Sequence, residues 1–410
     1  MTGHVVIVGS GIFGATAALE LRGRGWEVTL LDQGPIPHPK ATSNDSNRVV
    51  RPDYGSDDFY VDLALEAIAG WHDWNETWEE PPYHEDGFLL LSPEPLRPGT
   101  FEGDSYERLA ARGIPVAHLD AEAVRARFPA WRPDDYPEAY HNPRAGWTEA
   151  DRVLETLLRE AEGAGVRIRP NAPMKGLMQS DWGVVGIMVA DGERLESDIV
   201  LVAAGPWTPR LVPGLEEVMW PSGQPILYFQ PENADAFRSP VFSPWAADIA
   251  NSGWYGIAAL ADGRVKVASH GEGVRVDPGA DLTVPASTEP IFRAFLARAM
   301  PELAEAPAAG SRLCVYCDTW DGDFWIDHDP DRPGLVVATG GSGHGFKFAP
   351  VLGSIIADVV ERRPNPWAHR FRWRNREGRR TEDARSVVDL YEMRDCREAE
   401  ASHGGSDFDE

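Results

Sequence analysis

A glycine-rich stretch near the start of the chain has the spacing of a dinucleotide-binding turn. Residues 9–14 read Gly-Ser-Gly-Ile-Phe-Gly, which fits G-x-G-x-x-G between a β-branched run and an Ala- and Leu-rich stretch. Backbone N–H groups at a helix start, together with the helix dipole, can hold a pyrophosphate. Asp32 lies 18 residues after Gly14, where a carboxylate can bind a ribose. The pattern predicts a dinucleotide and does not separate NAD from FAD, but Asp32 disfavours NADP because it repels the extra phosphate.

Cysteine supplies a second candidate chemistry. Cys314 and Cys317 are spaced as Cys-x-x-Cys, and Cys396 is the only other cysteine in the chain. The pair can be two small buried residues, a redox pair or half of a zinc site. Zinc needs about four ligands, and only Cys396 can add another thiolate, so we expect no metal.

The elements around the glycine turn follow the order strand, helix, strand. We predict strands at 5–8, 27–32, 87–91, 166–168, 184–189, 198–205 and 334–340, and helices at 12–24, 60–71, 149–163 and 351–361. Short alternating runs at 228–229, 254–257 and 265–267 predict an antiparallel sheet between about 206 and 310.

Composition and charge exclude several classes of function. The chain has 410 residues, 42% of them hydrophobic, and a net charge of −26. Such a charge repels phosphate backbones and anionic lipids, so we expect neither nucleic acid nor membrane as a partner. No apolar run approaches the ~20 residues of a membrane helix, and we find no signal peptide or disulfide framework. We therefore expect a cytoplasmic protein.

Two motifs resemble a known group of flavoproteins. They are Arg312-Leu313-Cys314-Val315-Tyr316 and the run 340–348, Gly-Gly-Ser-Gly-His-Gly-Phe-Lys-Phe. The chain up to about residue 375 is similar to the monomeric sarcosine oxidase group, which also contains N-methyltryptophan, pipecolate and fructosyl-amino-acid oxidases. The resemblance implies FAD bonded covalently to the cysteine at position 314, with Cys317 as the nearby rival.

The resemblance also implies roles for several cationic side chains. Lys266 matches the lysine over the flavin that activates O2, where a fixed ammonium stabilises developing superoxide. Arg48 matches an arginine near the flavin. Arg51 and Lys347 match the residues that hold a substrate carboxylate, as a guanidinium fork and a point charge. The alternatives are an exposed strand lysine at 266 and surface ion pairs of the arginines with Asp53, Asp57 or Asp58.

The remaining expected site residues follow from the same resemblance. Tyr255 and Tyr316 match aromatic residues of the substrate cavity, His270 matches an active-site histidine, and Gly343 is expected to touch substrate. The fructosyl oxidases have an acidic residue at the position of His270. We expect the cofactor to contact Gly9, Ser10, Gly11, Ile12, Phe13, Gly14, Asp32, Gln33, Ser43, Asn47, Arg48, Cys314, Gly341, Gly343, His344, Gly345, Phe346 and Lys347.

These observations predict an α/β fold with a Rossmann-type FAD-binding domain and an inserted antiparallel-sheet substrate domain. We assign residues 1–80, 145–220 and 311–375 to the FAD-binding domain, 81–144 and 221–310 to the substrate domain, and 376–410 to a charged C-terminal tail. The acidic end of that tail should be mobile.

The expected activity is oxidation of a secondary amine, or of an N-substituted or cyclic amino acid, to an imine and H2O2. The resemblance keeps two related alternatives open, a fructosyl-amino-acid oxidase and a flavin dehydrogenase that uses an acceptor other than O2. A non-catalytic nucleotide-binding protein is a third alternative. We expect a monomer whose partners are a small amine substrate and O2.

Overall fold

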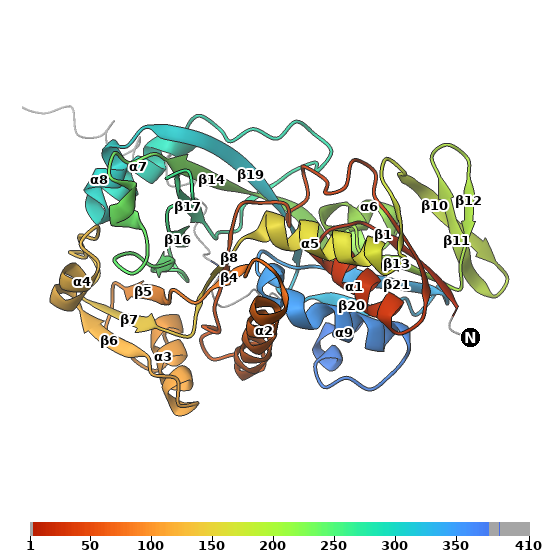
Figure 1. Cartoon of the computed structure of the whole chain (residues 1–410), viewed down its shortest axis with the longest axis horizontal. Helices are drawn as coiled ribbons and strands as arrows, with labels where there is room; N and C mark the ends of the chain where they lie inside the picture. The colour runs from red at the N-terminus through yellow and green to blue at the C-terminus, as the bar shows by residue number, and fades with distance from the viewer. Residues whose placement is uncertain (1–2, 377–384, 386–410) are drawn as a thin grey trace, which may run out of the picture.

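The computed structural model describes residues 3–376 and Arg385. Figure 1 shows an elongated molecule, with a six-stranded sheet toward the N-terminus and a nine-stranded sheet at the opposite end. The long strands β14 and β19 extend between the two parts. This arrangement confirms the predicted combination of a Rossmann-type unit with a largely antiparallel sheet.

The six-stranded sheet begins at the apolar run that precedes the glycine turn. Its strands are parallel except β20, which is antiparallel to β21. In sheet order the strands are β20 (Trp325–His328), β21 (Leu335–Thr339), β13 (Ile199–Val202), β1 (His4–Val8), β2 (Glu27–Leu31) and β9 (Arg167–Arg169). Strands buried on both faces lack alternation, which is why these segments appear as continuous apolar runs in the sequence.

Each face of this sheet contributes to a separate core. Val5 and Ile7 of β1 face helices α1 (Ile12–Gly23), α5 (Ala150–Gly163) and α9 (Ala349–Val360), and α1 packs against the other two. Val6 and Val8 face the other core, which includes the three-stranded sheet β10 (Met174–Ser180), β11 (Gly183–Val189) and β12 (Arg194–Glu196). Alternate residues of one strand point to opposite faces, so β1 anchors the glycine turn from both sides.

The nine-stranded sheet carries the other half of the molecule. In sheet order its strands are β18 (Val274–Arg275), β14 (Met219–Phe229), β17 (Val265–Ser269), β16 (Trp254–Ile257), β15 (Trp245–Ala247), β5 (Phe88–Ser92), β7 (Glu138–Asn142) and β6 (Ala117–Asp120), and β19 (Ala308–Thr319) pairs with β14. The segment from residue 311, which we assign to the FAD-binding domain, pairs with β14 of this sheet up to Thr319. The domain boundaries themselves stay a prediction.

The remaining elements cover and connect the two sheets. A small sheet joins β3 (Arg48–Val50), β8 (Gly146–Thr148) and β4 (Tyr83–His84). The other α-helices are α2 (Asp58–Thr77), α3 (Phe101–Ala111), α4 (Ala121–Arg127), α6 (Thr208–Leu211), α7 (Thr288–Ala299) and α8 (Pro301–Glu305). Short 3-10 turns lie at Gly205–Trp207, Leu215–Glu217, Ala234–Phe237, Gly345–Phe348 and Ala368–Phe371.

No helix of the described residues is both long and apolar enough to cross a membrane.

Candidate active site

The glycine turn is built so that side chains are excluded at two of its positions. Gly9 has φ +109°, and a Cβ there would lie 2.5 Å from the carbonyl oxygen of Ala203. A Cβ on Gly14 would lie 1.9 Å from the carbonyl oxygen of Gly9. At Gly11 a Cβ would have only the Ser43 hydroxyl in reach, at 3.4 Å. The turn is therefore tightly packed on the protein side and open at Gly11.

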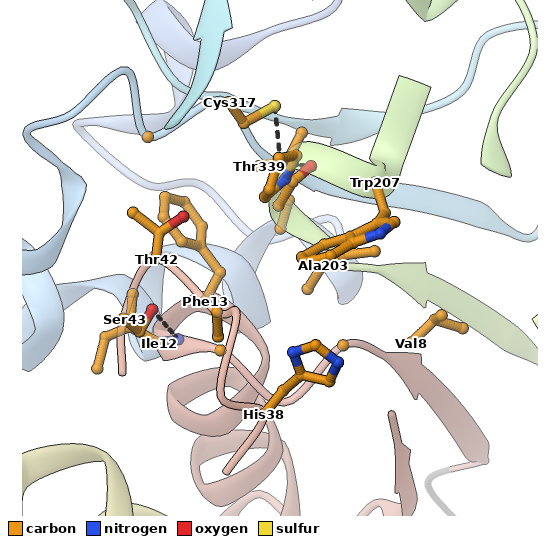
Figure 2. A pocket seen from close by; sticks show the side chains of 18 of the residues that line it. Val8, Ile12, Phe13, His38, Thr42, Ser43, Ala203, Trp207, Cys317 and Thr339 are labelled. Atoms are coloured by element: carbon orange, nitrogen blue, oxygen red, sulfur yellow. Dashed lines mark hydrogen bonds between the residues drawn. The ribbon is translucent and has the colours of Figure 1, made fainter. Parts of the chain in front are cut away.

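A cavity of about 390 Å³ opens in front of this turn (Figure 2). The Ser43 hydroxyl accepts a hydrogen bond from the N–H of Ile12 at 3.0 Å, and the rings of His38 and Trp207 meet edge to face, 5.4 Å apart. The residues that we predicted for the cofactor and that line this cavity are Gly9, Gly11, Ile12, Phe13, Asp32, Gln33, Ser43, Gly341, Gly343, Gly345 and Phe346.

Asp32 stands at the end of β2, beside the turn. Its Oδ2 accepts hydrogen bonds from the N–H of Ser10 at 3.0 Å and from the Ser10 hydroxyl at 2.8 Å. Ser10 is therefore buried behind the turn and acts through Asp32, whose carboxylate is fixed at the cavity wall.

A second, smaller cavity of about 70 Å³ meets the first one at Tyr316, Gly343 and Phe346. Its wall contains every residue that we predicted for catalysis or substrate binding: Arg48, Arg51, Tyr255, Lys266, His270, Tyr316, Gly343 and Lys347. A Cβ on Gly343 would lie 2.4 Å from Tyr316 and 2.9 Å from His270, so position 343 must be glycine for these rings to approach. The hydroxyls of Tyr255 and Tyr316 share a hydrogen bond, and burial raises the pKa of the Tyr255 phenol to about 12.

Lys266 is 1% exposed and belongs to a buried group of charges. Its Nζ donates to Asp45 Oδ2 at 2.7 Å and to the backbone oxygen of Asn47 at 3.1 Å. Burial lowers the pKa of Lys266 to about 8, although Asp45 opposes that shift. The Arg48 guanidinium also binds Asp45, and Arg48 and Lys266 together hold the pKa of the Asp45 carboxyl well below its usual value despite its burial.

Asp45 is a site residue that the sequence analysis missed. It also accepts a hydrogen bond from the Tyr228 hydroxyl at 3.0 Å, and Arg312 lies 3.9 Å away. A loop aspartate among Asn and Ser residues resembles an ordinary turn residue. The contact with Lys266 spans 221 residues of sequence, so no local sequence pattern could predict it.

Arg51 is a buried cation whose Nη1 has no hydrogen-bond partner among the described residues. Its guanidinium carbon lies 5.3 Å from the centre of the Tyr54 ring and 5.9 Å from that of Phe88. Asp53 is close in sequence, but its carboxylate accepts from the Tyr140 hydroxyl at 2.6 Å and from Asn142 at 3.1 Å. The expected alternative of a surface ion pair therefore does not apply to Arg51, which is 8% exposed.

Lys347 reaches the same aromatic ring as Arg51. Its Nζ lies 5.0 Å from the centre of the Tyr54 ring and donates to the Tyr54 hydroxyl at 2.8 Å and to the His344 carbonyl at 3.1 Å. The indole of Trp71, on α2, donates to the backbone oxygen of Lys347 at 2.7 Å. Two residues that are 296 positions apart thus present their cationic groups to one small cavity.

Two predicted cofactor residues have other surroundings. His344 is buried and forms hydrogen bonds with the Tyr54 hydroxyl and the Gly322 carbonyl, both at 3.0 Å, and its ring lines the smaller cavity. The side-chain amide of Asn47 is fully buried, and neither of its polar atoms has a hydrogen-bond partner among the described residues.

The two neighbouring cysteines face different surroundings. Cys314 Sγ lies 3.6 Å from Arg48 Nη2 and packs with Tyr316 and Tyr228. Cys317 lines the larger cavity, where Thr339 donates to its sulfur at 3.6 Å, and burial raises the pKa of its thiol to about 12 (Figure 2). Cys396 lies outside the described residues. Within those residues no group of three or more His, Cys, Asp or Glu side chains is placed to hold a metal.

Comparison with known proteins shows to which family of dinucleotide-binding enzymes the chain belongs. A family model described as FAD dependent oxidoreductase matches residues 4–359. The chain belongs to this family. Among its relatives, N-methyl-L-tryptophan oxidase of Escherichia coli strain K12 is 30% identical over 87% of this chain and 94% of that protein. Monomeric sarcosine oxidase of a Bacillus species is 24% identical over 87% of this chain and 91% of that protein.

Solved structures of similar fold include sugar-amine oxidases. An Amadoriase I of Aspergillus fumigatus, a fructosyl amine:oxygen oxidoreductase, has a TM-score of 0.76 and 25% identity and covers 91% of this chain and 90% of that one. The fructosyl peptide oxidase from E. terrenum has a TM-score of 0.81 at 22% identity, over 95% and 96% of the two chains, a likeness of fold alone.

The larger cavity has residues suited to each part of FAD, the cofactor of this family. The turn is closed to side chains at Gly9 and Gly14, and the N-terminus of α1, where Gly11 carries no side chain, suits a pyrophosphate. Asp32 offers a buried carboxylate to a ribose. The cavity then continues to Tyr316 and Gly343, where the second cavity begins. The residues present fit FAD, which the glycine turn and Asp32 would hold and which would supply the redox chemistry.

Proposed function

We propose that the chain is an FAD-dependent oxidase of a secondary amine that carries a carboxylate, such as an N-substituted or cyclic amino acid. The observation that carries the proposal is Arg51, a buried guanidinium with an unpartnered Nη1 in a small cavity that Lys347 also lines. Asp53 interacts with the charge of Arg51, but it does not satisfy the buried Nη1. A buried charged donor without a hydrogen-bond partner is unfavourable, and a bound carboxylate would supply that partner. A guanidinium fork and an ammonium together form a two-point clamp for such a group.

The same cations favour the reactive form of the amine. Lys266, Arg48 and Arg51 all line the cavity, and nearby positive charge lowers the pKa of a substrate ammonium. The neutral amine can release hydride from the adjacent carbon and become an imine, which water hydrolyses. FAD, when bound, accepts the two electrons and passes them to O2, which leaves as H2O2. The buried ammonium of Lys266 is the group suited to stabilise the developing superoxide.

A panel of paired substrates tests the carboxylate clamp. We expect an N-methyl or cyclic secondary amino acid to be oxidised, and its amide and decarboxylated analogues to react at least tenfold more slowly at equal concentration. In Arg51→Leu, the dissociation constant of the acid should rise by about one to two decades, since a hydrogen bond to a charged group is worth ~1.5–3 kcal/mol. Released peroxide and the rate of flavin reduction are the readouts.

Arg112→Leu is a matched control, because Arg112 is a partly exposed arginine that binds Asp58 and Asp62 on α2, away from both cavities. It should leave the dissociation constant unchanged. The proposed clamp would be refuted if the acid and its uncharged analogues were turned over equally, or if Arg51→Leu bound the acid as tightly as the parent does. The substrate class would then be open.

We also propose that FAD is attached covalently through Cys314. Its sulfur lies 3.6 Å from the Arg48 guanidinium, and Cys314 belongs to the same buried cluster as Tyr316, where the two cavities meet. Cys317 is the less suitable rival because its raised pKa keeps it a thiol. Acid precipitation should give a yellow pellet for the parent and for Cys317→Ser, and a colourless pellet for Cys314→Ser. A yellow Cys314→Ser pellet would refute the assignment.

A fructosyl-amino-acid oxidase is the second candidate, supported by the likeness to Amadoriase I. His270 favours the first candidate. The fructosyl oxidases have an acidic residue at this position, and an acidic side chain binds sugar hydroxyls better than an imidazole does. Including an N-fructosyl amino acid in the panel separates them: preferential oxidation of the fructosyl compound would favour this candidate. A dehydrogenase would instead be reduced by the amine but reoxidised slowly by air.

A further inference from the structure

Three arginines that follow α9 bind aspartates on β19 and on the turn after it. Each pair has a short nitrogen–oxygen distance: Arg370 and Asp323 at 2.9 Å, Arg374 and Asp321 at 2.6 Å, and Arg385 and Asp318 at 2.7 Å. As the residue number of the arginine rises, that of its partner falls toward Tyr316. Of the three pairs, that of Arg385 with Asp318 is therefore the nearest in sequence to Tyr316.

Arg385 is the pair member nearest to the reactive region, and it is 7% exposed. Its Nε donates to the carbonyl oxygen of Gly271 at 3.0 Å, and its guanidinium carbon lies 5.7 Å from the centre of the Tyr316 ring. Asp318 is 2% exposed and also accepts a hydrogen bond from the Ser222 hydroxyl. Removing Arg385 would leave a buried carboxylate without its ion-pair partner, which is strongly unfavourable.

Both residues that Arg385 binds, Gly271 through its carbonyl and Asp318 through its carboxylate, adjoin the candidate active site. Gly271 follows His270, which lines the smaller cavity, and Asp318 lies two residues after Tyr316 on β19. Residues two apart on a strand point to the same face, so Asp318 and Tyr316 share a face of β19. The rings of Tyr316 and His270 are 6.1 Å apart. One guanidinium thus connects the two segments that supply these rings.

We infer that Arg385 is a positioning residue of the substrate site, which fixes the Tyr316 ring and the backbone beside His270 in the arrangement that a substrate meets. The family match ends at residue 359, so this contribution comes from a part of the chain beyond the matched region. The kinetic consequence rests on the proposed amine oxidation, whereas the structural consequence can be read from the bound flavin alone.

The test is made on the full-length holoenzyme with Arg385→Ala. We expect the KM for the best amine of the panel to rise roughly tenfold, with a smaller change in kcat, because a charge-assisted contact that orients the cavity wall is lost. The visible circular dichroism of the bound flavin should change as well, because Tyr316 lines the cofactor cavity. Arg376→Ala is the matched control, since Arg376 is exposed and has no hydrogen bond or ion pair within the described residues; it should change neither quantity.

If Arg385→Ala does not fold, Arg385→Lys serves instead, because an ammonium can keep the ion pair with Asp318 but loses the planar fork that also reaches Gly271. It should fold and show a smaller rise in KM. A folded Arg385→Ala or Arg385→Lys with the parent's KM and the parent's flavin dichroism would overturn the inference. If no amine reduces the parent, the proposed function fails, and the dichroism still decides whether Arg385 shapes the site.

Discussion

At the scale of single residues, the site depends on one buried anion among several cations. Asp45 binds Lys266 and Arg48 and lies near Arg312, so its carboxylate offsets charges that would otherwise repel one another. The resemblance to known oxidases predicted Lys266 and Arg48, which are residues with recognisable motifs. It did not predict Asp45, because the contact between this carboxylate and Lys266 forms only when segments 221 residues apart come together in the fold.

The charge on Lys266 should make reoxidation of the reduced flavin depend on pH. Its pKa of about 8 means that the ammonium is lost as pH rises through 8, so the rate of reaction with O2 should fall there. Lys266→Met should be slower by roughly 10²–10³ at pH 7, with no such fall and a smaller effect on reduction by substrate. Stopped-flow measurement of the two half-reactions separates these effects.

Asp45→Asn provides the companion measurement. Asp45 raises the Lys266 pKa against burial and the charge of Arg48, so removing its charge should move the fall in reoxidation to lower pH. An unchanged pH profile in Asp45→Asn, or equal slowing of both half-reactions in Lys266→Met, would show that Lys266 has another role.

At the scale of elements, the first strand, turn and helix could be predicted because their signals are local. The expected strand 5–8 and helix 12–24 correspond to β1 (His4–Val8) and α1 (Ile12–Gly23). The strand β19 (Ala308–Thr319) was not predicted, since its residues were interpreted only as a motif. Its period of two explains why Cys314 and Cys317, three positions apart, face different surroundings.

The tight packing of the glycine turn leads to a prediction about Gly14. Gly14→Ala should abolish FAD binding and lower the melting temperature, because the new Cβ would lie 1.9 Å from the carbonyl oxygen of Gly9 and force the turn apart. Gly23→Ala, in the same helix, is the control, since its Cβ would meet nothing within 4 Å. The readouts are the flavin-to-protein absorbance ratio and thermal unfolding. A Gly14→Ala protein that retains the parent's flavin content would contradict the role of the turn.

At the scale of the whole molecule, the site exists only where segments from distant parts of the chain converge. The wall of the smaller cavity includes residues of β3, β5, β15, β16, β17, β19 and the turn Gly345–Phe348. Periodicity in the sequence predicts β16 and β17, but it predicts neither β3, β19 nor the turn Gly345–Phe348, and it cannot give the spatial order of the elements. The family resemblance implied the fold class for residues up to about 375, whereas no sequence motif indicated the contact of Arg385 with Asp318.

The central claim is that a carboxylate-bearing amine reduces the FAD of this chain and that O2 reoxidises it. The most direct test mixes the oxidised holoenzyme, without oxygen, with an N-methyl amino acid, a cyclic secondary amino acid and an N-fructosyl amino acid in turn, and follows the visible flavin absorbance. We predict that the N-methyl or cyclic amino acid bleaches the flavin, and that admitting air restores the colour and releases one equivalent of H2O2 per flavin. A flavin-loaded protein that none of these compounds bleaches would contradict the account.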